Sequence, residues 1–489
     1  MNLKQYKKVC IACDRILDAA SKNDEIISFP ILHVIREHPE YLKLYNFIFS
    51  KTRNIETKPF NLFKKLNLIA STFFDYKIKN IPYNFDKDSR KLIIVSHIHN
   101  PAQCNNINDA SFGMLHKDLL EFSNIKPIIL LINHTSVSSK KLSKNLTKNK
   151  IDRIIMPKSS GLFNELRILF RLVSSVYRFT KSIKTNNHIE SSLIKAISRP
   201  GNLIQSMSIL RIGFFVEKMV KINKPKYIIT THEGYASERI IFSSARKINN
   251  AILCFGYQHS ILNKYQHSLT RSIHKKYNPD HIFCCGDITN NKLSNCDSLN
   301  RVETSVLGSP NGLPININSK IPENNKSLTF LFLPEGIKSE YKIFFNFILE
   351  CAKVFPSYNF IWRSHPSLDI EKLDLLQEKI LPSNIIISNN TFDDDLQVSN
   401  IAIYRGSSAI IRAVMANLTP IYLKTKGEIG IDLMHDLNLS RVLSTSELQS
   451  SIRQSSLLMN RESNLKFCKE YFRPLDYKSF IQVVNRYDS

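Results

Sequence analysis

Short apolar runs alternate with amphipathic stretches and divide the chain into two similar series. In the first series, residues 92–96, 127–132, 153–156, 227–230 and 251–256 are apolar, and each run ends in a polar loop. The second series repeats this pattern at residues 328–333, 359–362, 384–387, 401–404 and 420–423, with helical spacing over 341–354 and 409–416. Strands that alternate with helices predict βαβ units and parallel sheets. We therefore expect an α/β fold with two Rossmann-like parallel-sheet domains.

Helical patterns flank the two series. From residue 6 to about residue 80, apolar residues recur at spacings of three and four, and residues 446–487 are again helical in pattern. A polar, proline-containing segment over 313–326 has the composition of a linker. The predicted organisation is a helical N-terminal elaboration (1–85), an N-terminal sheet domain (86–315), a C-terminal sheet domain (327–460), and a C-terminal helix (461–489) that packs back on the N-terminal half.

Length and composition indicate a globular chain with more than one core. The chain has 489 residues, of which 43% are hydrophobic, and a domain usually holds about 100 to 200 residues. No apolar run approaches the roughly 18 residues of a membrane-spanning helix. Asp14 and Asp18 interrupt the N-terminus before the apolar core of a secretion signal could form. These features predict a cytoplasmic protein, and its nine scattered cysteines are expected to be free thiols.

The charge adds a prediction about partners. Lys and Arg total 67 against 42 acidic residues, which gives a formal net charge of +25. Such a chain should attract polyanions or an anionic membrane surface, so we expect weak, salt-sensitive peripheral attachment at the inner membrane. The basic residues are spread widely, without a zinc finger, an RNP-type aromatic motif or an arginine-rich block. Nucleic acid is therefore not an expected partner.

Loops after the strands of the second series carry side chains suited to a phosphate group. In open parallel sheets, ligands bind beyond the carboxyl ends of the strands. Gly406 permits close backbone approach, and two hydroxyls follow it at the start of a helix whose free amides suit a phosphate. Helix capping is the alternative role for these serines. The candidate donor-binding residues are Glu335, Gly336, Arg363, His365, Pro366, Gly406, Ser407 and Ser408.

The strand ends of the first series offer a base and acceptor contacts. Glu233 follows the strand over 227–230 and precedes a helix around 237–246, so it should point into the cleft between the halves; complementing the helix dipole is the alternative. The candidates for holding the acceptor, or a carboxylate of the donor, are Gln258, His259, His97 and His99. His134 also stands at a strand end. No metal is expected, because these histidines lack a spacing such as His-Glu-x-x-His, and we expect the acidic residues 393–395 to be the solvated start of a helix.

Several of these motifs resemble bacterial sialyltransferases and polysialyltransferases. His365-Pro366 is followed 42 residues later by Ser407-Ser408, as in the His-Pro and Ser-Ser motifs of those families. Glu233-Gly234 is similar to their acidic-Gly motif, in which an Asp or Glu is the general base, although His232 stands where a second acidic residue is often found. The runs 256–260, 279–286 and 306–310 resemble capsule and surface-polysaccharide transferases, including those that transfer 3-deoxyoctulosonic acid.

The resemblance implies a GT-B-like fold, with the donor in the C-terminal half, the acceptor in the N-terminal half, and no required metal or cofactor. It implies transfer of a CMP-activated nonulosonic or octulosonic acid onto a bacterial surface polysaccharide or a lipid-linked glycan. In this interpretation Glu233 and His365 are the catalytic residues: Glu233 is the base, and His365 stabilises the departing phosphate. Two alternatives stay open: a different donor, such as a CDP-polyol or a UDP-sugar, and a non-catalytic glycan-binding assembly subunit.

Overall fold

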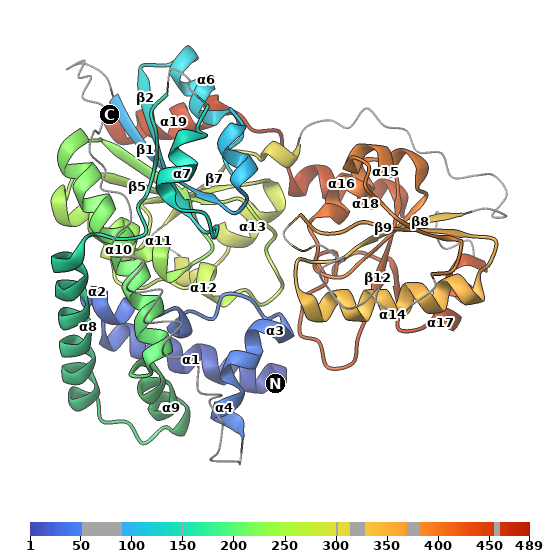
Figure 1. Ribbon diagram of the computed structural model, residues 1–489, viewed down its shortest axis with the longest axis horizontal. Coiled ribbons are helices and arrows are strands. Elements are labelled where there is room, and N and C mark those ends of the chain that lie inside the picture. The colour runs from blue at the N-terminus through green and yellow to red at the C-terminus, as the bar shows by residue number, and fades with distance from the viewer. Residues whose placement is uncertain are drawn as a thin grey trace.

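Two separate parallel sheets organise the molecule, as Figure 1 shows. The computed structural model describes residues 1–50, 90–147, 151–299, 302–312, 328–366, 368, 381–453 and 460–489. The predicted linker over 313–326 and residues 51–85 of the predicted elaboration lie outside these described residues. The predicted GT-B-like class is confirmed: two Rossmann-like α/β units stand side by side, with helices at the N-terminus and a C-terminal crossing helix.

The first sheet has seven parallel strands in the order β3-β2-β1-β4-β5-β6-β7. Its central strands are runs of β-branched and aromatic residues that are buried on both faces, as expected for a parallel sheet covered by helices. The strand order changes direction at β1: β2 and β3 are added on one side of it, and β4 to β7 on the other. The position between β1 and β4 is therefore a topological switch point. The strands are β1 (Arg90–Ile98), β2 (Ile125–Asn133), β3 (Arg153–Ile155), β4 (Tyr227–Thr231), β5 (Leu253–Gln258), β6 (His281–Cys284) and β7 (Glu303–Val306).

Helices cover both faces of the first sheet. The longest, α8 and α10, lie at the outer side of this half (Figure 1). The helices of this half are α6 (Leu115–Phe122), α7 (Ser139–Lys144), α8 (Leu162–Ser182), α9 (His188–Ile197), α10 (Pro200–Asn223), α11 (Ala236–Ile248), α12 (His267–Thr270) and α13 (Asp287–Ser294), with 3-10 turns at Pro101–Asn105, Lys275–Tyr277, Asp297–Leu299 and Pro310–Gly312.

The N-terminal segment forms a small helical layer that packs beside α8, α9 and α10. Its apolar residues share one core with those helices, and its own elements are short after the first helix. The elements are α1 (Leu3–Ala19), α2 (Asp24–Ile27), α3 (Pro39–Leu42) and α4 (Asn46–Phe49), with 3-10 turns at Pro30–Leu32 and Lys43–Tyr45. The residues just before α3 extend to the second sheet domain, since His38 Nε2 lies 3.0 Å from Oε1 of Glu340 in its first helix, α14 (Lys338–Val354).

The second sheet has six parallel strands in the order β10-β9-β8-β11-β12-β13 and has its switch point between β8 and β11. An aromatic-rich core lies between the sheet and its longest helix, where Trp362 is fully buried. The elements are β8 (Thr329–Leu333), α14 (Lys338–Val354), β9 (Asn359–Trp362), β10 (Ile385–Ile387), α15 (Phe392–Val398), β11 (Ile401–Tyr404), α16 (Ala409–Met415), β12 (Thr419–Leu423), β13 (Ser440–Val442) and α17 (Thr445–Arg453).

The C-terminal part of the chain crosses back to the first half. Helix α18 (Arg461–Tyr471) packs between α13 and α16, and α19 (Tyr477–Asp488) lies on the first sheet. Phe480 of α19 packs against Phe255 and Phe283, which come from β5 and β6. Two helices of the tail therefore belong to different cores, and the crossing lies at residues 472–476 between them.

Two glycines of the first half lie in close contact with the backbone of the returning chain. Gly308 has φ +88°, and a Cβ there would lie 2.0 Å from the carbonyl oxygen of Pro474. A Cβ at Gly286 would lie 2.3 Å from the carbonyl oxygens of Glu470 and Tyr471. Both glycines belong to the runs that resemble surface-polysaccharide transferases. Their role here is to let the returning backbone pass at contact distance.

Ten strands were expected from apolar runs, and each of these runs forms a strand in the structure. The runs do not predict β6, β7 and β13. Strand β7 is polar and only partly buried, and β13 has three residues, so neither produces an apolar run. The C-terminal crossing helix and an N-terminal helical segment are present as expected; after α1 the described N-terminal elements are short, and the predicted helical pattern beyond residue 50 lies outside the described residues. Among the described residues, no helix is long and apolar enough to cross a membrane.

Candidate functional site

The acidic-Gly motif forms the tight loop between β4 and α11. The carboxylate of Glu238 accepts hydrogen bonds from the backbone N–H groups of Glu233, Gly234 and Tyr235, at 2.8 to 3.0 Å. Gly234 has φ +85°, and a Cβ would lie 2.3 Å from the backbone of Ser268, so glycine is required. Burial, followed by the charge of Glu233, raises the pKa of Glu238 well above its usual range. The second carboxylate of this loop therefore comes from Glu238 rather than from position 232.

The Glu233 side chain lies at the carboxyl edge of the first sheet and is 7% exposed. Its Oε1 accepts a short hydrogen bond from Ser260 Oγ and lies 3.9 Å from Nδ1 of His259. Burial lowers the pKa of His259, and the charge of Glu233 opposes that shift. The neighbours are thus a hydroxyl and a largely neutral imidazole. The sequence predicted both Glu233 and His259 at this edge, and the structure brings them together.

Gln258 and His232 face inward instead. Gln258 is 1% exposed; its amide donates to the carbonyl oxygen of Ser260, and its oxygen faces Cys285 Sγ at 3.4 Å. His232 is fully buried against Gly256, with Nδ1 3.2 Å from Glu238. These contacts give Gln258 a positioning role beneath the loop that carries Ser260 and His259.

Three histidines gather at the ends of β1 and β2. Nδ1 of His97 lies 2.8 Å from Nε2 of His134, and the rings of His99 and His134 stack with centroids 4.8 Å apart. Nε2 of His97 lies 3.0 Å from Thr231 Oγ1. Burial, and then the neighbouring histidines, hold the pKa of His97 well below its usual value; burial also lowers that of His134, to about 4. The sequence placed these residues at strand ends but did not predict that they touch.

At the switch point of the second sheet, Glu335 packs directly on Gly406. A Cβ at position 406 would lie 2.0 Å from Glu335 Oε1, and all three nearest atoms belong to this carboxylate. Glu335 is 8% exposed, and among the described residues its buried Oε2 has no hydrogen-bond partner. His38 Nε2 lies 3.6 Å from that oxygen. A buried carboxylate oxygen without a donor costs free energy unless a ligand supplies one, so Glu335 is well placed for a hydroxyl or amino group.

Ser407 and Ser408 follow Gly406 on the same loop. Ser407 is 8% exposed and Ser408 is exposed. Ser408 stands at the N-cap position of α16, but its side chain makes no capping hydrogen bond, and its backbone is already helical (φ −65°, ψ −17°). The Ser408 side chain therefore does not cap helix α16, contrary to the alternative role considered for it.

Arg363 and Pro366 follow β9 in the chain and differ in their contacts and exposure. Nη1 of Arg363 lies 2.6 Å from Asp395 Oδ2, and the guanidinium lies over Phe392. Pro366 is exposed. Asp395 is fully buried and also accepts from Ser388, so the prediction of a solvated acidic triplet is wrong for this residue, although the triplet does begin helix α15. Arg363 and the hydroxyl of Ser388 together satisfy the buried Asp395 carboxylate.

His365 lies in the same loop and is partly exposed. Its backbone N–H donates to the hydroxyl of Tyr341 on α14 at 2.5 Å, which fixes the loop to the body of the domain. Burial lowers the pKa of His365 below its usual value. A neutral imidazole held by a rigid loop can donate one hydrogen bond to a phosphate oxygen. Gly336, at the end of β8, is exposed.

The N-terminal segment contributes residues that sequence analysis did not identify. Although burial lowers it, the carboxylates of Glu335 and Glu233 raise the pKa of Arg36 above its usual value, so this guanidinium lies near the candidate residues of both halves. Glu37 and His38 are buried beside it. The available signal was the charged run before Pro39, which interrupts the helical pattern. The segment 36–38 therefore lies near candidate residues of both halves: the charges of Glu233 and Glu335 both act on Arg36, and His38 contacts Glu335 and Glu340.

Arg405 is at the centre of a buried ion cluster in the second domain. Its guanidinium binds Glu340 and Glu428, the latter at 3.0 Å, and donates to the carbonyl oxygen of Leu423 at 2.8 Å. Since Glu340 also binds His38, this buried ion cluster holds the start of α14 against the N-terminal segment. The cluster supports the loop that carries Gly406 and the serines.

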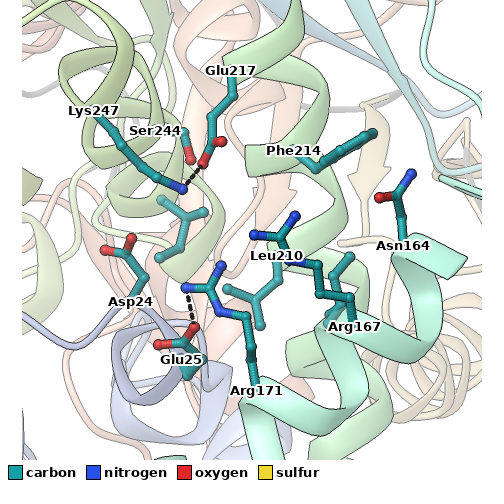
Figure 2. A pocket seen from close by; sticks show the side chains of 12 residues that line it. Asp24, Glu25, Asn164, Arg167, Arg171, Leu210, Phe214, Glu217, Ser244 and Lys247 are labelled. Carbon is teal, nitrogen blue, oxygen red and sulfur yellow. Dashed lines mark hydrogen bonds and ion pairs between the residues drawn. The ribbon is translucent and has the colours of Figure 1, made fainter.

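A pocket of about 130 Å³ lies elsewhere, among α2, α8, α10 and α11 (Figure 2). Figure 2 shows ion pairs closing it from two sides, Arg171 with Glu25 and Lys247 with Glu217. None of the residues predicted for the site lines it. Its acids and bases neutralise one another, so we interpret it as a seam between helices.

No protein-family model matches the chain, and no curated protein matches it significantly. It is similar in structure to the glycotransferase of kitacinnamycin (TM-score 0.48, 9% identity, 82% of this chain and 99% of that one). It is also similar to UDP-GlcNAc 2-epimerase from Neisseria meningitidis bound to UDP-GlcNAc (0.43, 13%, 81% and 100%) and to Acinetobacter baumannii MurG (0.44, 12%, 81% and 99%). Identities this low concern the fold alone, and TM-scores below 0.5 support no conclusion about ligand or activity.

Proposed function

We propose that this protein is a glycosyltransferase that binds a nucleotide sugar at the carboxyl edge of the second sheet and an acceptor glycan at the edge of the first. The observation that carries the proposal is the buried Glu335 carboxylate on Gly406: one of its oxygens has no hydrogen-bond partner among the described residues, and Ser407 and Ser408 directly follow Gly406 in the chain. In parallel sheets this switch point is where nucleotides bind. Arg36 supplies a cation near both edges, which suits an anionic donor.

The roles follow from position. Glu233 takes the proton of the acceptor hydroxyl while the new glycosidic bond forms and the bond to the phosphate breaks. His365, Ser407 and Ser408 donate hydrogen bonds to the phosphate as it gains charge. His97, His99 and His259 line the edge at which the acceptor or a donor carboxylate would lie. Gly336, Arg363 and Pro366 border the donor; because Arg363 is bound to Asp395, it shapes the loop rather than contacting the phosphate directly.

The motifs favour a CMP-linked ulosonic acid as donor, whereas the edge of the second sheet is equally suited to a CDP-polyol or a UDP-sugar. A phosphate site does not identify the base, so binding must decide. We would titrate the purified chain with CMP, CDP and UDP by calorimetry. Ser407→Ala with Ser408→Ala should weaken binding of the preferred nucleotide, whereas Ser463→Ala, at an exposed position of α18, should not. UDP binding without CMP binding selects the UDP-sugar, and no nucleotide binding favours the glycan-binding subunit.

Attachment to an anionic membrane is the second part of the proposal, and α8 provides the surface. The large exposed hydrophobic residues of α8 are Leu162, Phe163, Leu166, Leu169, Phe170, Val173 and Tyr177. At 100° per residue they share one stripe about 120° wide. Exposed Arg167 and Arg178 stand beside the stripe, and the single acid of the helix, Glu165, is buried against Arg211. An apolar stripe flanked by arginines matches an anionic lipid interface.

A further inference from the structure

His97, His99 and His134 are positioned by strand geometry. His97 lies in β1 and His99 is two residues further on, so their side chains lie on the same face of the strand. The parallel register of β1 and β2 pairs Ile98 with Asn133, and the N–H of His134 donates to the carbonyl oxygen of Ile98 at 2.9 Å. The third histidine therefore comes from the neighbouring strand at the same level.

The three side chains converge through their ring nitrogens. One nitrogen from each lies within 4.8 Å of the others, and the closest pair, between His97 and His134, is 2.8 Å apart. Two nitrogens that bind one tetrahedral Zn²⁺ at 2.0 to 2.1 Å are separated by about 3.3 Å. The pair at 2.8 Å is closer than this value, and none of the three separations exceeds 4.8 Å. Because His99 and His134 are exposed, small ring movements would bring all three nitrogens to the spacing for Zn²⁺.

Surrounding groups hold the cluster and leave one side open. Thr231 Oγ1 lies 3.0 Å from Nε2 of His97, which leaves Nδ1 to face the other histidines. Gln103 accepts from the backbone N–H of His99 at 2.8 Å. His259, the neighbour of Glu233, lies close enough to influence His97 and His99 electrostatically. The cluster is therefore next to the proposed acceptor edge.

We propose that His97, His99 and His134 bind one divalent transition-metal ion of the Zn²⁺ type, with its remaining position open to an oxygen ligand. Three histidine ligands with a fourth position open to water or substrate are typical of catalytic zinc sites. The sequence did not predict this site, because its ligands come from two strands and not from one helix, and they therefore lack the i, i+4 spacing. The proposal does not depend on the identity of the donor or on transferase activity.

Metal binding by the untagged full chain tests the proposal. After dialysis against a chelator, the protein is titrated with Zn²⁺ in competition with a chromophoric indicator, and with Co²⁺ to record visible absorption. We expect one Zn²⁺ per chain and the intense Co²⁺ bands of a four-coordinate site. His99→Ala and His134→Ala should each lower affinity by at least about 100-fold, and Thr231→Val by about 10- to 100-fold, because orienting partners have effects of that size.

His188→Ala is the matched control, since His188 is an exposed histidine on α9, away from the cluster. Its affinity for Zn²⁺ should equal that of the wild type. The proposal is wrong if the wild type binds no Zn²⁺ at one equivalent, or if His99→Ala and His188→Ala bind it equally. Circular dichroism of each variant shows whether the fold is kept, and nucleotide titration measures the proposed function separately.

Discussion

Gly406→Ala is a direct perturbation of the proposed donor edge. The new Cβ would lie 2.0 Å from Glu335 Oε1 and 2.7 Å from Cδ. Ordinary contacts between such atoms are near 3.5 Å, so the carboxylate must retreat by more than 1 Å. Gly406 is not among the glycines with positive φ, so its backbone accepts alanine. The Glu335 side chain is thus the obstacle; because its carboxylate is the end of a flexible side chain that can turn away, the cost should lie toward the lower end of the about 1 to 3 kcal/mol typical of overpacking.

A double-mutant cycle isolates this contact. Gly406→Ala is measured in the wild type and in Glu335→Ala by urea unfolding, with nucleotide titration in parallel. The destabilisation of about 1 to 3 kcal/mol should largely disappear in the Glu335→Ala background, because the obstructing atoms are gone. Nucleotide affinity should fall in Gly406→Ala, and Glu335→Gln should also chiefly weaken donor binding. If Gly406→Ala lowers the free energy of unfolding equally in both backgrounds, the contact between Gly406 and Glu335 is not the cause of the destabilisation.

Four further outcomes are expected. Glu233→Gln keeps shape but removes the basic carboxylate, so turnover should fall about 100-fold or more with donor affinity nearly unchanged; unchanged turnover removes Glu233 as the base. His365→Ala should lower turnover by about 100- to 1000-fold while the melting temperature changes little, and activity within about threefold of wild type would exclude it from the site. Burial raises the pKa of Glu37 from 4.5 to about 7, so its contribution to stability is present below about pH 4.5 and is lost as the pH rises through 7 and the buried carboxyl ionises. Glu37→Gln cannot ionise and should raise the melting temperature at pH 8 but not at pH 4. Equal effects at both pH values would refute this. Phe163→Ser with Phe170→Ser, which are 87% and 76% exposed, should reduce low-salt sedimentation with anionic vesicles, whereas equal sedimentation of wild type with neutral and anionic vesicles would exclude the membrane proposal.

A control for the vesicle experiment comes from the second half. Val398→Ser removes a comparably exposed apolar side chain, 59% exposed, at the end of α15. It should not change vesicle binding. Added salt should weaken binding by the wild type, because the interaction of the α8 arginines with lipid is screened over about 8 Å at physiological ionic strength. If the double variant instead abolishes self-association in light scattering, the stripe is an interface between copies.

Sequence patterns predicted those parts of the fold that rest on local periodicity. Buried parallel strands are continuous apolar runs, so β1 and β8 were evident. Strands β7 and β13 were not, because partly buried or very short edge strands satisfy their backbone without an apolar run. The strand-end rule placed Glu233, Glu335 and Gly406 at sheet edges, since it depends only on chain direction.

Contacts between distant segments could not be predicted in this way. Arg36 is near enough to Glu233 and Glu335 for both carboxylates to raise its pKa only because the helical layer that carries it packs against α10 and α11. Likewise, Arg363 appeared available to a donor until the fold placed the buried Asp395 beside it. Periodicity reports which face of an element is buried, but not which distant charge lies opposite. The roles of these two arginines therefore required the three-dimensional structure.

The returning tail has a consequence for synthesis on the ribosome. The strands of the first sheet emerge first, yet the apolar surface around Phe255 and Phe283 is covered by α19, about 200 residues later. Until residues 477–488 have been made, the nascent first half exposes this surface and lacks the backbone that fills the contacts at Gly286 and Gly308. Such a chain is expected to recruit chaperones during translation. Its N-terminal domain would complete folding after the C-terminal domain, in reverse of the order of synthesis.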